Sequence, residues 1–217
     1  MNTETFDFKL FLDDSQRVLT KPLAYFETLR TTGGIIEPLL KVFFYGSAAG
    51  ILFFLWGLLN FSAEGALFGG AVGFMVLIWW VIGSVIGLFI FSGIIMVISS
   101  ICRGNVDFEV SLRVAASIMV LMPVIALISI LGEWNIYFFK LISIIVNLYG
   151  LWMLYLGLVH SLKTENHTAR NATIILAVFV VLFGILGSGY IGGSTRRYIR
   201  NLEINDRETR EWFKGKD

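Results

Sequence analysis

The sequence predicts an all-α protein, a polytopic bundle of transmembrane helices preceded by amphipathic helices. Hydrophobic residues make up 56% of the 217 residues and charged residues only 15%, whereas about 25% of the residues in a soluble domain are charged. Several apolar stretches reach the roughly 20 residues that a helix needs to cross the hydrocarbon core of a bilayer. The N-terminal region instead mixes polar and apolar residues with the period of a helix.

Residues 1–38 are predicted to form an interfacial segment on the cytoplasmic side. Its first apolar residues recur at helical spacing: Phe8, Phe11, Leu12, Val18 and Leu19. Thr20 followed by Pro22 is typical of the start of a second helix. Two arrangements are expected as alternatives. The helices lie on the membrane surface, or they pack under the bundle.

Five stretches are long and apolar enough to span a membrane. The transmembrane domain that contains them covers residues 39–192, and a charged tail, residues 193–217, follows it. The predicted spans are residues 39–61, 81–102, 110–131, 134–160 and 173–191.

The apolar stretch between the first and third spans has two interpretations. Residues 66–102 carry no charged side chain, and as one straight helix they would be about 55 Å long, nearly twice the hydrocarbon thickness. A break at Trp79-Trp80 leaves residues 65–80 interfacial or re-entrant and gives five spans, because paired tryptophans prefer the interface. A break at Gly83-Ser84 gives a hairpin and six spans.

Basic residues favour neither topology outright. The total number of Lys and Arg residues on the inner side is higher with six spans, whereas the internal loops alone fit five spans with the N-terminus inside. The loops that hold Arg103 and Lys163 are basic, and those around Glu64 and Glu133 carry no Lys or Arg. Both topologies are therefore kept.

Polar residues within or beside the spans are the candidates for a functional site, because they are costly in lipid. They are Lys140, Asn147, Glu64 and His160. Asn147 lies near the middle of its predicted helix, and Lys140 lies two turns earlier on a similar face. Structural pairing, with Lys140 extending to the interface, and a substrate or ion site are the alternatives.

Glycines recur four residues apart, a spacing that lets helix backbones approach closely in lipid. They are Gly46 and Gly50; Gly65, Gly69 and Gly73; and Gly83 and Gly87. Packing within one chain and contact between two copies are the alternatives.

The residue patterns do not predict an enzyme, a metal or a cofactor. Cys102 and the two histidines are separated in sequence and make a poor metal site. No hydrolase, metalloprotease or nucleotide-binding motif occurs, and the serines of the spans lack a neighbouring base. The net charge of +1, without a basic stripe, argues against nucleic acid as a partner.

Three groups of residues form an ordered pattern over roughly residues 15–190. The first runs from Arg17-Val18-Leu19-Thr20-Lys21-Pro22 through Phe26 to Gly33-Gly34-Ile35-Ile36-Glu37-Pro38-Leu39. The second comprises Arg103-Gly104, Phe108, Leu112-Arg113-Val114 and Pro123, and the third is the run 147–158 with Lys163-Thr164. In order and spacing they resemble the prokaryotic members of the Yip1-domain family, with Pro22, Arg113, Pro123, Tyr149 and Gly157 as the family-pattern residues.

The resemblance implies a five-span bundle with the N-terminus in the cytoplasm and the C-terminus across the membrane. Eukaryotic members of the family bind prenylated small GTPases and act in vesicle traffic. They carry a longer cytosolic region with an "LYGP" motif, which this sequence does not contain, so the GTPase role is not transferred.

The expected function is that of a non-enzymatic scaffold or adaptor in the cell membrane, acting in membrane organisation or trafficking-like processes. A carrier or channel for a small or lipidic solute is the alternative, and an intramembrane enzyme is the third class. Membrane lipids are the expected partners, with a protein partner or a second copy of the chain as further alternatives.

Overall fold

The computed structural model describes residues 8–58 and 63–184, and for residues 57–58, 63–74, 76, 133 and 134 it describes the backbone alone. Every regular element in these residues is helical, which confirms the all-α prediction. The elements are α1 (Phe8–Thr20), α2 (Pro22–Glu27), α3 (Ile36–Leu58), α4 (Ala63–Ile101), α5 (Phe108–Ile118), α6 (Leu121–Ile128), α7 (Leu131–Trp134), α8 (Ile136–Leu156), a π-helix η1 (Gly157–Ser161) and a last helix, Asn166–Gly184. The predicted tail, residues 193–217, lies outside the described residues. The chain divides into two compact units at Ala177.

Five segments are long and apolar enough to cross a membrane, so the five-span prediction is confirmed. They are Ile36–Trp56, Leu77–Ile101, Phe108–Ile128, Ile136–Ser161 and Asn166–Gly184. The last segment begins before the predicted residue 173, because its polar first turn is helical too. There the Ala169 N–H donates to the Glu165 carbonyl at 2.9 Å.

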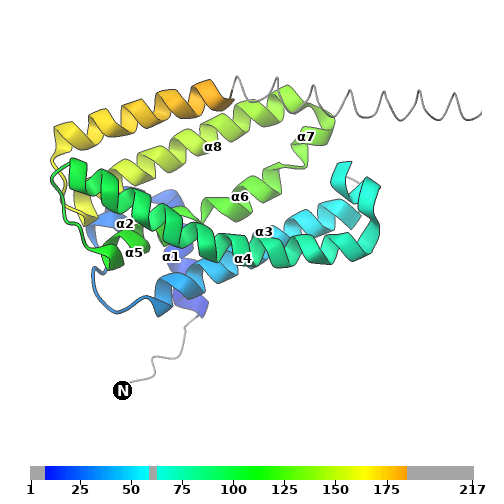
Figure 1. Ribbon diagram of the computed structural model, residues 1–217, viewed down its shortest axis with the longest axis horizontal. Coiled ribbons are helices and arrows are strands. Elements are labelled where there is room, and N and C mark those ends of the chain that lie inside the picture. The colour runs from blue at the N-terminus through cyan, green and yellow to red at the C-terminus, as the bar shows by residue number, and fades with distance from the viewer. Residues whose placement is uncertain (1–7, 59–62, 185–217) are drawn as a thin grey trace, which may run out of the picture. The chain divides into compact units, whose positions relative to one another are not determined.

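The long helix α4 corrects the prediction that the second apolar stretch breaks. It runs without interruption over 39 residues, so neither Trp79-Trp80 nor Gly83-Ser84 ends a helix, and the six-span hairpin is wrong. An isolated glycine costs a helix only about 1 kcal/mol, and the Ser84 hydroxyl is satisfied by the Val81 carbonyl of the same helix at 2.8 Å. The extra length is accommodated before Leu77, where Figure 1 shows the first turns of α4 bent away from the rest.

Helices α3 and α4 lie side by side and run antiparallel (Figure 1). A Cβ atom on Gly46 would overlap the Ser84 side chain, and one on Gly50 would lie 3.2 Å from the Cβ of Trp80. The ring of Phe53 stacks on that of Trp80 with centroids 4.6 Å apart. Glycine at both positions therefore lets the two backbones approach closely, as the four-residue spacing predicts.

The other predicted packing glycines differ among themselves. A Cβ atom on Gly87 would make an ordinary contact with Met119, whereas one on Gly83 would meet nothing within 4 Å in the described part of the chain. Gly83 is therefore not required for packing within the described bundle. The surroundings of Gly65, Gly69 and Gly73 lie outside what the structure describes.

Helix α5 is central to the first unit, and all its residues from Val110 to Ile118 are buried. The Asp107 carboxylate caps its first turn by accepting the Glu109 N–H at 2.8 Å. The helix ends at Met119, and α6 continues the same span. Pro123, the predicted membrane proline, explains the break, because it has no N–H to donate to the carbonyl four residues earlier.

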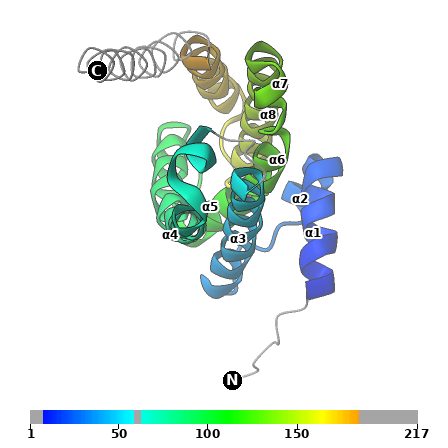
Figure 2. The same ribbon diagram turned by 90° about the vertical axis from the view of Figure 1, so that its right-hand side faces the viewer.

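The N-terminal helices pack against the bundle on one side and are exposed on the other. Buried residues of α1 and α2 are Phe11, Val18, Pro22, Tyr25 and Phe26, whereas Phe8, Leu10, Leu12 and Leu23 are exposed. Figure 2 shows α1 at the outer edge of the bundle, beside α3. Of the two arrangements expected, packing on the bundle is therefore the one observed, and it leaves an apolar flank uncovered.

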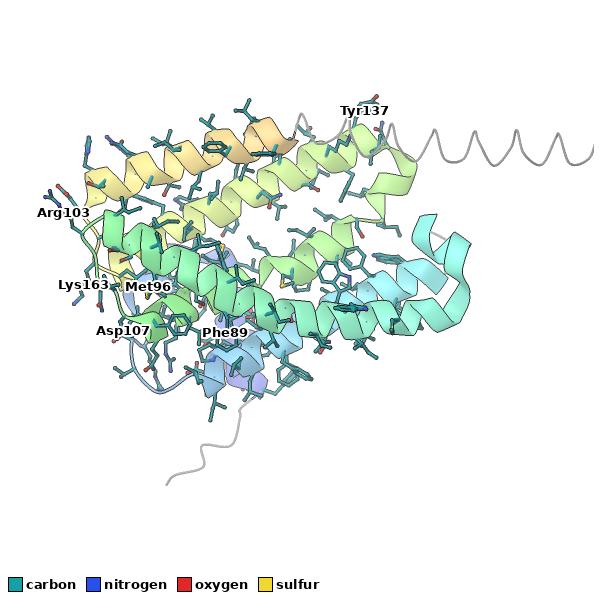
Figure 3. All side chains as sticks on the ribbon, viewed as in Figure 1. Phe89, Met96, Arg103, Asp107, Tyr137 and Lys163 are labelled. Carbon is teal, nitrogen blue, oxygen red and sulfur yellow. The ribbon has the colours of Figure 1, made fainter. Side chains whose placement is uncertain are left out.

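The two basic loops lie at the same end of the first unit as α2. Figure 3 shows Arg103, Asp107 and Lys163 at this end and Tyr137 at the opposite end. Helix α2 lies at the same end, where the Ser161 hydroxyl of η1 donates to the Phe26 carbonyl at 3.0 Å. The N-terminal helices and both basic loops thus occupy one side of the bundle.

Candidate functional site

Arg113 on α5 is a buried charge around which polar groups from three segments gather. Its side chain is 3% exposed, and Nη1 lies 2.8 Å from the Oε2 of Glu37. Nη2 donates to the Gly34 carbonyl at 3.0 Å, and Nε donates to the Oε1 of Glu109 at 3.3 Å. Each guanidinium nitrogen therefore has a partner, as a charge within a span requires.

The loop before α3 is shaped around this arginine. Gly33 and Gly34 have φ angles of 132° and 86°, values that residues with a Cβ rarely adopt. A Cβ atom on Gly33 would lie 2.8 Å from the Nη2 of Arg113. The Gly34 N–H also donates to the Oε1 of Glu109 at 2.7 Å. Two motifs far apart in the sequence, Gly33-Gly34 and the one centred on Arg113, thus meet in one set of contacts.

Lys41 on α3 extends the charged cluster to α1. Its Nζ lies 2.9 Å from the Oδ2 of Asp14 and 3.1 Å from the Oε1 of Glu37, and its side chain is 9% exposed. Acidic and basic groups therefore alternate along one chain of contacts. We call this chain the ionic cluster, and its members are Asp14, Lys41, Glu37, Arg113 and Glu109.

Hydroxyl groups tie the N-terminal helices to four further places in the bundle. The pairs are Ser15 with Tyr45 (2.8 Å), Tyr25 with Ser117 (3.0 Å), Tyr149 with the Leu19 carbonyl (2.7 Å) and Ser161 with the Phe26 carbonyl (3.0 Å). Burial raises the pKa of the Tyr25 phenol, which therefore stays neutral and able to donate. Helices α1 and α2 are fixed by these contacts as well as by charge.

A small cavity lies beside the ionic cluster. Its volume is about 10 Å³, which is about the space that one water molecule needs. The lining residues are Leu29, Glu37, Pro38, Lys41, Arg113, Ala116 and Ser117. Glu37, Lys41 and Arg113 therefore surround a space of about the size of one water molecule.

The third group of the sequence pattern joins the same region through Gly157. A Cβ atom there would lie 2.5 Å from the Cγ1 of Val114 and 3.4 Å from the Cε1 of Phe26. Gly157 also opens the π-helix η1, in which the Leu162 N–H donates to its carbonyl at 3.0 Å. Pro22, buried in the first turn of α2, occupies a position where a helix tolerates proline.

The polar residues that the sequence singled out lie elsewhere and apart. Lys140 lies with its Nζ 5.8 Å from the ring centroid of Tyr137. Asn147 is exposed and donates to the Ser143 carbonyl of its own helix at 2.8 Å. His160 lies 3.8 Å from the Oε1 of Glu27. The side chain of Glu64 lies outside the described residues.

Lys41 and the partners of Arg113 are what the sequence-based search for a site missed. The sequence places Lys41 near the start of the first predicted span and Arg113 in the motif Leu112-Arg113-Val114, and neither position predicts a site. A usable signal exists in each case, because each has a carboxylate four residues before it, Glu37 and Glu109. That spacing places the two charges of a pair on one helix face.

Among the residues that the structure describes, no group of three or more His, Cys, Asp and Glu side chains is placed to hold a metal ion. Cys102 is buried, and burial raises the pKa of its thiol. The thiol therefore stays protonated at neutral pH, the form that does not ligate metals.

The fold and the ionic cluster define a multi-pass helical membrane protein whose N-terminal helices are held on the transmembrane bundle by buried charges. The Yip1 domain model matches residues 17–188, and the chain belongs to this family. The match confirms the family, the Yip1-domain family, that the three groups of residues indicate. No curated protein and no solved structure matches the chain.

Proposed function

We propose that the protein is a non-enzymatic scaffold or adaptor of the cell membrane that presents α1 and α2 at the cytoplasmic interface. The observation that carries the proposal is that α1 is buried on one side and exposed on the other. Phe11 and Val18 are 7% and 1% exposed, whereas Phe8 and Leu12 are 53% and 51% exposed. One side of the helix is thus fixed to the bundle, and an apolar flank is left for another surface.

The exposed flank has the geometry of a binding surface. Phe8 and Leu12 lie one turn apart, so their side chains share a face of α1. Leu23 on α2 is also exposed. Apolar area outside the spans is stabilised by burial at about 25 cal/mol per Å², which favours its contact with lipid or with a protein partner.

The ionic cluster holds α1 on the bundle, which supports a role in which the exposed flank is presented in a fixed position. Asp14 connects α1 to α3 through Lys41, and the hydroxyl pairs connect α1 and α2 to α5 and α8. A partner that binds the flank therefore meets helices that are already ordered, which lowers the entropic cost of binding.

Leu12→Glu tests the proposal, with Arg17→Glu as the control, because Arg17 is exposed and lies about 140° around α1 from Leu12. The full chain is extracted gently from native membranes, and the proteins and lipids that co-purify are identified by mass spectrometry. We expect a stoichiometric partner with the wild type and the control, and its loss with Leu12→Glu, because a buried carboxylate at the contact is costly.

Two results would overturn the proposal. One is an unchanged set of partners in all three proteins. The other is a specific small solute without a protein, whose binding is lost on Asn147→Leu or Lys140→Leu, since that result identifies a carrier.

A further inference from the structure

Two short turns meet at the end of the bundle where α2 lies. One, residues 102–105, begins the connection from α4 to α5, and the other, residues 162–165, joins η1 to the last helix. The Asn105 N–H donates to the Leu162 carbonyl at 2.7 Å, and the Glu165 N–H donates to the Cys102 carbonyl at 3.2 Å. The two turns therefore run antiparallel to each other.

Each turn holds a long cation in a backbone conformation that favours glycine. Arg103 has a φ angle of 56° and Lys163 one of 52°, and they are the non-glycine residues with positive φ among those the structure describes. Gly104, beside them, is required by space, since a Cβ atom there would overlap Thr164. Glycine thus stands at position 104, where space is short, and not at the two positions with positive φ, which carry Arg103 and Lys163. Residues held in such a strained backbone conformation point to function.

The two cations are not paired within the described part of the chain. Both are exposed, and Figure 3 places them at the outer edge of this end. The carboxylates nearest in sequence have other partners. Asp107 accepts the Glu109 N–H at 2.8 Å, and Glu165 accepts the Thr168 hydroxyl at 3.1 Å.

Two further features of the turns favour an anion. Helix α5 and the last helix both begin here, at Phe108 and Asn166, and helix N-termini attract negative charge. The Thr164 hydroxyl is buried and has no hydrogen-bond partner among the described residues. Buried polar groups are normally paired, so this hydroxyl indicates that a water molecule or another group lies beside the turn.

We propose that Arg103 and Lys163 together bind the phosphate group of one anionic phospholipid. Both turns directly follow spans, which end at Ile101 and Ser161, so the cations lie at the depth of lipid headgroups. A guanidinium matches two phosphate oxygens and an ammonium supplies a compact charge. Basic residues at the ends of spans attract anionic lipids in this way. The site is separate from the exposed flank of α1 and holds whether or not that flank binds a partner.

The test measures binding of phosphatidylglycerol and of phosphatidylcholine to the purified full chain in mild detergent, by native mass spectrometry. We expect one tightly bound phosphatidylglycerol on the wild type. The double variant Arg103→Gln with Lys163→Gln should bind it roughly tenfold or more weakly. Arg17→Gln with Lys21→Gln removes two exposed cations elsewhere and should leave the affinity unchanged.

A second variant separates binding from folding. Replacement of both residues by glycine, Arg103→Gly with Lys163→Gly, removes the charges and relieves the backbone at positive φ. We expect its melting temperature without added lipid to equal or exceed that of the wild type, and its rise in melting temperature with phosphatidylglycerol to be lost.

Three results would overturn the proposal. In the first, the glycine variant binds phosphatidylglycerol as tightly as the wild type. In the second, phosphatidylcholine binds equally well. In the third, inorganic phosphate competes with phosphatidylglycerol at equal affinity, which would identify a site for a soluble anion instead of a lipid.

Discussion

Arg113 on α5 and Lys140 on α8 each carry a positive charge within a segment long enough to span a membrane. Arg113 is buried, and its three nitrogens contact Glu37, Gly34 and Glu109. Lys140 is partly exposed and lies over the ring of Tyr137, one turn earlier on the same helix. The contacts of Arg113 thus join distant segments, whereas the contact of Lys140 is local.

The difference follows from the place of each helix in the bundle. Helix α5 is surrounded by other helices, so a charge on it is satisfied only by what those helices bring. The part of α8 around Lys140 faces outward, with Tyr137, Phe138 and Leu141 exposed, so a long side chain can extend to the interface. A charge within a span therefore indicates a tertiary site only where the helix that carries it is central.

Exchange of each cation for leucine should give the largest contrast. Arg113→Leu leaves the Gly34 carbonyl without its partner, while Glu109 keeps the Gly34 N–H and Glu37 keeps Lys41. We expect the free energy of unfolding to fall by about 3 kcal/mol, the lower end of the range for a broken buried pair. The measurement is unfolding by a denaturing detergent, followed by tryptophan fluorescence.

Lys140→Leu is the matched control for this change. It removes the same charge from a partly exposed position, and we expect a change of less than about 0.5 kcal/mol. Equal losses in the two variants would show that the ionic cluster contributes no more than a local contact.

A smaller contrast is expected between two glycines. Gly157→Ala places a methyl group 2.5 Å from the Cγ1 of Val114 at the crowded end of the bundle, and overpacking of this kind costs about 1–3 kcal/mol. Gly83→Ala, on α4, meets nothing within 4 Å among the described residues. Thermal unfolding in detergent should therefore show a loss for the first and none for the second. A loss with Gly83→Ala alone would contradict the packing described.

The smallest contrast compares two neighbours on α8. Tyr149→Phe removes a hydrogen bond to the Leu19 carbonyl of α1, worth about 1 kcal/mol, and should speed hydrogen exchange of the amides at the end of α1. Asn147→Leu removes a bond within α8 and should leave exchange in α1 unchanged. Faster exchange in α1 with Asn147→Leu would show that α8 couples to α1 in a way these contacts do not explain.

The number of spans could be predicted from the sequence because apolar length is a local property. The continuity of α4 could not, since a helix longer than the bilayer is thick can break or bend, and residues 66–102 contain no proline to decide it. The ionic cluster was beyond prediction for another reason. Arg113 and Glu37 lie 76 residues apart, and one sequence shows charges without showing which of them meet.

The same limit explains why the sequence indicates Asn147 and Lys140 as candidate site residues. Both stand out because their neighbours are apolar, yet each contacts its own helix. Gly46 and Gly50 lie where α3 and α4 approach closely, because small residues four apart act on any helix that lies beside them. Gly83 has the same spacing, but a Cβ atom on it would meet nothing within 4 Å in the part of the chain that the structure describes.

The alternation of charge in the ionic cluster has a consequence for biogenesis. The ribosome delivers Asp14, Glu37 and Lys41 well before Arg113. Glu37 and Lys41 are one helical turn apart and already form a pair at 3.1 Å, so α3 can enter the bilayer with its two charges neutralising each other. The Gly34 carbonyl and the second carboxylate oxygen of Glu37 gain their partner, Arg113, only when α5 inserts. Helix α1 can thus dock on α3 early, through Asp14 and Lys41, whereas the contact of α2 with α5 forms only when the third span arrives from the translocon.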